Sequence, residues 1–177
     1  PLKENPHFVN LLTTFENPFM GIIVGILFTA VLQSASASVG ILQALSVTGS
    51  ISFAAALPIT MGIGVGAACP VLLSSIGTNR NGKRTALIYL LNDLFGMVFW
   101  SIVFYSVNAV VHFSFMDLTM SPVTVALMNS VFRMATILVL VPFISKIEKL
   151  VFWLIKEDPE DLEEQADFDL LEERFLD

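Results

Sequence analysis

Apolar residues dominate the chain in blocks, and the first two blocks are too short to cross a lipid bilayer alone. The run from Met20 to Leu32 has thirteen residues, which rise about 20 Å as a helix against the roughly 30 Å of a bilayer's hydrocarbon core. A polar segment, Gln33 to Ser38, separates it from a second short run, Val39 to Val47. This pattern predicts a re-entrant hairpin or a broken membrane helix, and the pattern alone does not distinguish the two.

The third apolar block runs from Phe53 to Ile76 and contains a glycine-rich interruption. Glycines stand at the alternate positions Gly62, Gly64 and Gly66, and Pro70 follows. Because glycine and proline both disfavour a continuous helix, we expect this block to be discontinuous as well. Its bare backbone could form the wall opposite the Gln33–Ser38 segment, or the glycines could serve close helix packing, which is common in membranes.

Two longer helices complete the pattern. We expect them at about residues 85–111 and 122–145, joined by a short loop over residues 112–121, while residues 78–84 form a polar loop before the first. Basic residues precede the first helix and follow the second: Arg80, Lys83 and Arg84, then Lys146, Lys149 and Lys156. An out-and-back passage places both clusters on one side of the membrane, and the positive-inside rule makes that side, with the C-terminal tail, cytoplasmic.

The composition agrees with a membrane protein. Of the 177 residues, 55% are hydrophobic and only 14% are charged, whereas soluble domains carry roughly 25% charged residues. We therefore predict an all-α, polytopic membrane protein in the lipid bilayer. Three parts are expected: an interfacial lead-in over residues 1–18, the membrane region over residues 19–156, and an acidic tail over residues 157–177.

The net charge of −7 belongs to the tail, because residues 157–177 hold 11 acidic side chains and 1 basic one, while residues 1–156 hold 5 and 8. No basic surface for nucleic acid is expected. A single cysteine, Cys69, excludes a disulfide framework within one chain. The start of the sequence lacks the features of a signal peptide and resembles the interior of a longer chain.

The polar segment around Gln33 is the first candidate site. Gln33, Ser34, Ser36 and Ser38 stand at a predicted break inside the membrane region. A helix end there would supply free backbone N–H groups for an oxyanion, while hydroxyl and carbonyl oxygens could ligate a hard cation. The alternative is that small residues at this point only let helices pack closely.

Charged and amide side chains inside the two long helices form the second candidate. Asn92 and Asp93 lie within the first, and Arg133 lies within the second. A charge at such a depth costs at least about 2.5 kcal/mol, so each is expected to face the protein interior. Their similar depths allow an Asp93–Arg133 ion pair, which could be purely structural. In the functional alternative, Arg133 helps to hold an anion, and Asp93 tunes that site or takes part in cation coupling.

An enzyme has little support from the sequence. There is no Ser/His/Asp set, no HExxH and no P-loop. No cofactor is expected.

These residues resemble the bacterial sodium/phosphate cotransporters related to the type II animal symporters. Residues 29–37, TAVLQSASA, are similar to that family's TxxxQSSSA motif, and the segment from Gly62 to Ala67 falls where the family has GxNIGT. The segment from Arg84 to Asn92 resembles an R-x-A…FN element. Residues 168–177 look like the opening of a PhoU-like helical domain.

The resemblance implies sodium-coupled symport of inorganic phosphate by alternating access, in a bacterial plasma membrane. Gln33, Ser34 and Ser36 match the motif residues that contact substrate or sodium, and sodium is placed near Ser34, Ser36 and Gly66. Family members contain two inverted repeats, and this chain looks like the second one. The missing first repeat, or a second copy in an antiparallel homodimer, would supply the other half of the site.

The chain also departs from the family's pattern. Ala35, Gly64 and Ala67 stand where the family has Ser, Asn and Thr, and Asn129 and Arg133 stand where it often has His and Asn. The loss of three polar side chains favours an alternative hypothesis, in which a degenerate repeat acts as a membrane scaffold or phosphate-signalling protein. The retained Gln-Ser segment favours transport.

Overall fold

The computed structural model describes residues 14–156, and these residues form helices joined by short connections. The predictions for the acidic tail and the PhoU-like segment, and most of the lead-in, lie outside this range. The helices are α2 (Pro18–Leu32), α3 (Ala35–Ser46), α4 (Phe53–Gly66), α5 (Ala68–Ser74), α6 (Arg80–Val111), α7 (Pro122–Leu140), the 3₁₀ turn η2 (Val141–Phe143) and α8 (Ile144–Leu154). The predicted all-α class is confirmed.

Three helical stretches are long and apolar enough to cross a membrane. They are residues 53–74, 80–111 and 122–154, with 22, 32 and 33 residues. Few residues of α6 and of the α7–α8 stretch are fully buried, whereas α4 is buried along nearly its whole length. Because a soluble protein would bury such surfaces, the exposed sides of α6 and α7 fit a lipid environment.

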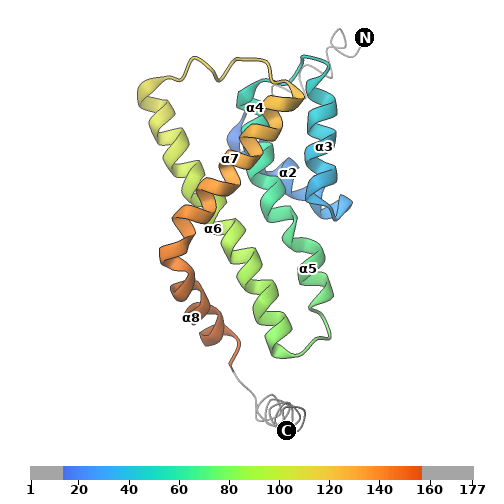
Figure 1. Cartoon of the computed structure of the whole chain (residues 1–177), viewed down its shortest axis with the longest axis vertical. Coiled ribbons are helices and arrows are strands. Elements are labelled where there is room, and N and C mark those ends of the chain that lie inside the picture. The colour runs from blue at the N-terminus through green and yellow to red at the C-terminus, as the bar shows by residue number, and fades with distance from the viewer. Residues whose placement is uncertain (1–13, 157–177) are drawn as a thin grey trace, which may run out of the picture.

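The helix predicted to break near Gln33 is broken there. α2 ends at Leu32, α3 begins at Ala35, and Gln33 and Ser34 form the tip between them. The two arms form a helical hairpin whose outer ends lie toward one end of the molecule, while the tip lies near its mid-length (Figure 1). The chain turns back at the tip, so of the two arrangements that the apolar pattern left open the described residues form a helical hairpin (Figure 1).

The predicted discontinuity of the third block is much smaller than expected. α4 passes into α5 at Ala67, whose φ of −66° and ψ of −18° remain helical. Pro70 lies in the first turn of α5, where a missing backbone N–H removes no intrahelical hydrogen bond. The glycines lie inside α4, so their backbone is helical rather than looped.

The boundaries of the long helices differ from prediction at their basic ends. α6 begins at Arg80, because the Asn79 side chain accepts a hydrogen bond of 3.0 Å from the Gly82 N–H and caps the helix. Residues 80–84, predicted as loop, are thus its first turns. After α7, Pro142 lies in the 3₁₀ turn η2, and α8 continues to Leu154. The predicted end at residue 145 was therefore too early.

Arg84 joins the two basic ends. Its guanidinium donates hydrogen bonds of 3.0 and 2.9 Å to the carbonyl oxygen of Ile155, just beyond α8, and lies 4.2 Å from the centre of the Phe152 ring. The start of α6 and the end of α8 are therefore held together, which places both basic clusters at one end of the molecule (Figure 1).

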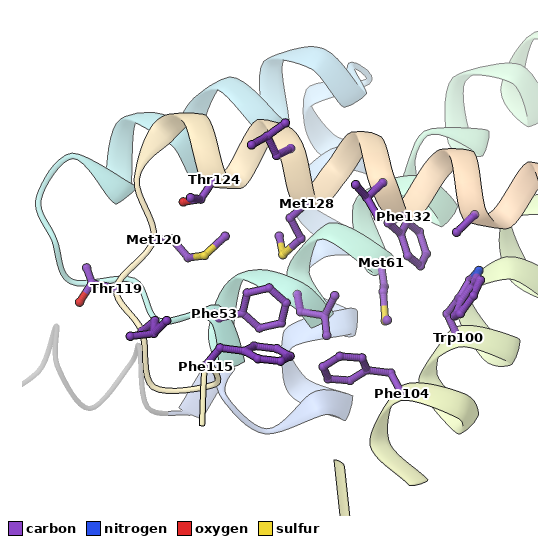
Figure 2. Close-up of a pocket in the computed structure, with 15 residues that line it drawn as sticks. Phe53, Met61, Trp100, Phe104, Phe115, Thr119, Met120, Thr124, Met128 and Phe132 are labelled. Atoms are coloured by element: carbon purple, nitrogen blue, oxygen red, sulfur yellow. The ribbon is translucent and has the colours of Figure 1, made fainter. Parts of the chain in front are cut away.

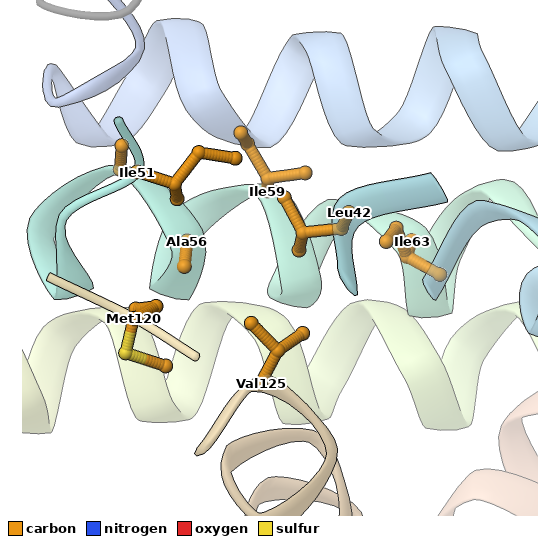
Figure 3. Close-up of a cluster of buried hydrophobic side chains, with 8 residues drawn as sticks. Leu42, Ile51, Ala56, Ile59, Ile63, Met120 and Val125 are labelled. Carbon is orange, nitrogen blue, oxygen red and sulfur yellow. The ribbon is translucent and has the colours of Figure 1, made fainter. Parts of the chain in front are cut away.

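The core lies around α4. Its apolar side chains come from α3, α4, the start of α7 and the segments leading into α4 and α7 (Figure 3). They are Leu42, Ile51, Ala55, Ala56, Ile59, Ile63, Met120 and Val125. The connection from α6 to α7 crosses the start of α4, where Phe53 and Ala54 donate backbone hydrogen bonds of 2.9 and 3.0 Å to the carbonyls of Leu118 and Met116. These bonds satisfy N–H groups that a helix start leaves open.

Candidate functional site

The tip of the α2–α3 hairpin has an unusual backbone conformation at Gln33. Gln33 has a φ of 53° and a ψ of 26°, in the left-handed region, and its N–H donates a hydrogen bond of 2.7 Å to the Thr29 carbonyl. A non-glycine residue in this region costs about 1–2 kcal/mol. Such strained residues cluster at functional sites. The Gln33 side chain is exposed, so packing does not explain why a glutamine stands there.

Ser34 begins α3 as its N-cap. Its hydroxyl accepts a hydrogen bond of 3.3 Å from the Ala37 N–H, and it lies 3.2 Å from the Ser36 hydroxyl. Ser34 is half-buried and Ser36 is exposed. Two neighbouring hydroxyls beside the open N–H groups of a helix start can serve an oxyanion or a small hard cation.

Ser38 has a structural role instead. Its hydroxyl donates a hydrogen bond of 3.0 Å to the Ser34 carbonyl and accepts one of 2.9 Å from the Thr29 hydroxyl. Both Thr29 and Ser38 are almost completely buried. This chain of hydrogen bonds ties the two arms of the hairpin together at its tip. Of the four polar residues predicted at the tip, three therefore face outward or lie half-exposed, and Ser38 supports them from within.

The three glycines of α4 face two different ways. A Cβ at Gly66 would lie 2.5 Å from the Ile26 carbonyl oxygen and 2.8 Å from the Thr29 Cβ, and a Cβ at Gly62 would collide with the backbone of α2. Both glycines therefore allow close contact between α2 and α4. A Cβ at Gly64 would have room, with its nearest neighbour the Asp93 Oδ1 at 3.8 Å. Residues two apart in a helix point away from each other, which explains the division.

Gly64 lines a polar cavity between α4, α6 and α7. The cavity has a volume of about 240 Å³. Its polar lining comes from the side chains of Thr60, Tyr89, Asn92, Asp93, Arg133 and Thr136, and apolar side chains form the rest of its wall. The structure thus brings together all three residues that were singled out inside the long helices, and it adds Tyr89, Thr60 and Thr136. Tyr89 stands one helical turn before Asp93, so helical spacing could have identified it.

Asp93 and Arg133 share this cavity but do not form an ion pair within the described residues. The Asp93 Oδ2 atom is buried and has no hydrogen-bond partner. Thr60 and Thr136 use their hydroxyls on carbonyl oxygens of their own helices, at 2.8 Å each, and so do not satisfy the carboxylate. A buried acceptor without a partner is costly, and among the residues that line the cavity Asp93 is the one with such an atom.

A larger, apolar cavity adjoins the polar one. Its volume is about 560 Å³, and side chains from α4, α6, α7 and the connection before α7 point into it (Figure 2). Phe53, Trp100, Phe104 and Phe115 supply aromatic surface. Met61 and Phe132 line both cavities, so these two side chains form the wall between them.

The hairpin tip and the polar cavity are separate. None of the tip residues lines either cavity, and α4 turns Gly62 and Gly66 toward α2 but Gly64 toward α6. Gly62 and Gly66 thus show the close helix packing that was the alternative for this segment, while Gly64 faces the polar cavity. The tip and the polar cavity are thus two distinct polar sites on different sides of α4.

Comparison with known proteins gives one match. The sequence model of the Na+/Pi-cotransporter family matches residues 4–144. No curated protein and no solved structure matches significantly. Because the match covers most of the chain, this chain belongs to the Na+/Pi-cotransporter family, which supports a general role in sodium and phosphate transport and a place in the membrane.

Proposed function

We propose that this member of the family performs sodium-coupled symport of inorganic phosphate by alternating access. The observation that carries the proposal is the hairpin tip, where the strained Gln33 and the hydroxyls of Ser34 and Ser36 are presented outward from a broken helix. The family match supports both phosphate and sodium as transported species. Phosphate would contact the amide of Gln33 and the open N–H groups at the start of α3.

Sodium would bind beside the phosphate, near Ser34, Ser36 and Gly66. The two serine hydroxyls lie 3.2 Å apart, and hydroxyl and carbonyl oxygens are the ligands that hard cations prefer. Gly66 lies against Thr29, whose hydroxyl bonds Ser38 behind the tip. A cation in this place would offset the charge of the phosphate, so binding of each ion would favour the other.

The hairpin would be re-entrant, with its tip within the membrane. Helices of 15 and 12 residues are each shorter than a bilayer crossing, and both arms run from one end of the molecule (Figure 1). Lipid tolerates a broken backbone at depth only beside protein or in a water-filled cavity. The exposed side of the tip would therefore face another protein element, either the other repeat of a two-repeat transporter or a second, antiparallel copy of this chain.

The orientation follows from the basic residues. Arg84 holds the start of α6 beside the end of α8, so the lysines and arginines of both segments gather at one end. The positive-inside rule places that end in the cytoplasm. The hairpin arms would then begin from the opposite side.

The test is uptake of radiolabelled phosphate into proteoliposomes with an imposed sodium gradient. Wild-type protein is compared with Gln33→Ala and with Gly40→Ala, a control on the same hairpin at a position with open space around it. We expect sodium-dependent uptake by wild type and by Gly40→Ala, and loss of uptake in Gln33→Ala. Folded protein that neither transports nor binds phosphate would contradict the proposal and favour the scaffold hypothesis.

A further inference from the structure

The polar cavity between α4, α6 and α7 holds opposite charges that do not neutralise each other by direct contact. Asp93 and Arg133 both line its wall, and the Asp93 Oδ2 atom has no hydrogen-bond partner. Burying charges at the depth of these helices is costly. If Asp93 and Arg133 formed a purely structural ion pair, the two side chains would be in direct contact to offset that cost. The open arrangement therefore indicates that a third group completes the site.

The chemistry of the two side chains limits what that group can be. A guanidinium can only donate hydrogen bonds, and an ionised carboxylate can only accept them. A bridging ligand must therefore accept from Arg133 and donate to Asp93. A metal cation would satisfy Asp93 but would be repelled by Arg133. An anion without a proton would be held by Arg133 but repelled by the carboxylate of Asp93.

We propose that this cavity binds a protonated oxyanion, and that Asp93 selects hydrogen phosphate over sulfate. At neutral pH phosphate retains at least one proton, so one oxygen can donate to Asp93 while its charged oxygens accept from Arg133. Sulfate has the same tetrahedral shape and a similar charge but no proton, and it would set a bare oxygen against the carboxylate. Rejection by a buried, unpaired polar group is the strongest form of discrimination between similar ligands.

The surrounding structure suits this ligand. A volume of about 240 Å³ leaves room for one small oxyanion with water. Asn92 can donate or accept on a further oxygen, and Gly64 removes a side chain from the wall nearest Asp93. The inference rests on the proposed function for its choice of phosphate, but the site is distinct from the hairpin tip.

The test is equilibrium binding of radiolabelled phosphate to the purified chain in detergent, with unlabelled sulfate as competitor. Wild type is compared with Asp93→Asn, which keeps the size of the side chain but removes its negative charge and replaces one accepting oxygen with a donating NH₂ group. The matched control is Asp117→Asn, the same chemical change at an exposed position in the 112–121 connection. We expect wild type and Asp117→Asn to prefer phosphate strongly, and Asp93→Asn to lose at least about tenfold of that preference.

Two further variants separate a loss of binding from a loss of folding. Arg133→Gln should weaken both anions together. Gly64→Ala should weaken phosphate binding while the melting temperature is retained, since the added methyl group meets nothing closer than 3.8 Å. Each variant is first checked for a single peak in size-exclusion chromatography.

The outcomes distinguish this inference from the proposed function. If Asp93→Asn is folded and binds phosphate with an unchanged preference over sulfate, the inference is overturned while sodium-coupled transport stands. The same holds if Asp93→Asn alters only the sodium dependence, because the cavity would then hold a cation. If selectivity depends on Asp93 but proteoliposomes show no uptake, the cavity assignment stands and transport fails. Wild type that binds neither anion would overturn the cavity assignment.

Discussion

The contact between α2 and α4 makes Gly66 a sensitive test of how the hairpin is held. A methyl group at this position would lie 2.5 Å from the Ile26 carbonyl oxygen and 2.8 Å from the Thr29 Cβ. Ordinary C–H···O contacts are about 3.3–3.6 Å, so the two helices would have to separate by about 1 Å. The obstacle is backbone, which cannot rotate away.

The expected magnitude follows from two opposing effects. Alanine in place of glycine favours a helix by about 1 kcal/mol, whereas overpacking costs about 1–3 kcal/mol. Gly66→Ala should therefore destabilise the protein by about 0–2 kcal/mol relative to wild type, and by about 1–3 kcal/mol relative to an alanine substitution that has only the helix effect. In Gly40→Ala the helix effect acts alone, because nothing lies within 4 Å of the added group, and that variant should be as stable as wild type or slightly more stable.

The assay is thermal unfolding of both variants and wild type in one detergent. One kcal/mol corresponds to roughly 2–4 °C for a chain of this size, so Gly66→Ala should melt several degrees below Gly40→Ala. A melting temperature for Gly66→Ala equal to or above that of Gly40→Ala would refute the packing argument. Loss of sodium-dependent uptake without any loss of stability would instead identify Gly66 as part of the ion site.

Three further predictions concern the tip and the basic end. Gln33→Gly should raise the melting temperature by roughly 2–4 °C by relieving the left-handed strain and yet abolish uptake, so retained uptake would show that the amide is dispensable. Ser38→Ala should cost about 1–3 kcal/mol by leaving a buried hydroxyl donor unpaired, and Thr29→Val should cost less; equal losses in thermal unfolding would contradict this. Arg84→Lys should lose about 1.5–3 kcal/mol and speed hydrogen exchange in α8, whereas the exposed Lys83→Ala should change neither.

The features that the sequence predicted well are those with a local physical cause. The break near Gln33 follows from the length of two apolar runs, and the ends of the long helices at Val111 and Pro122 follow from local signals. Ser121 forms a capping box with Thr124, and Pro122 occupies the first helical position, where it needs no N–H partner. These interactions join residues a few positions apart, so they can be recognised in one dimension.

The features that could not be predicted depend on contacts between distant segments. The glycine-rich segment looked like a helix break, but close packing against α2 covers its backbone and offsets the intrinsic cost of glycine in a helix. Arg80 and Arg84 looked like loop residues, but Arg84 bonds a carbonyl 71 positions away. A pattern of neighbouring residues cannot predict a partner so far away in the sequence.

The candidate residues inside the helices were predicted from the free-energy cost of a charge inside the membrane, not from the geometry of the site. A buried charge in a membrane helix must have a reason, and this argument identified Asp93 and Arg133 without indicating that they would stay apart. Their arrangement depends on how α6 and α7 pack against α4, since both side chains line a cavity in which Gly64 contributes no side chain. The proposed ion pair was thus a fair inference from depth, and the cavity between the two charges is what the structure adds.

α4 is the element that relates the two polar sites. Its Gly62 and Gly66 bring α2 into close contact and so fix the hairpin tip, while Gly64, on the opposite face, opens the cavity beside Asp93. The position of the hairpin and the width of the cavity beside Asp93 therefore depend on the same helix, through three glycines at alternate positions.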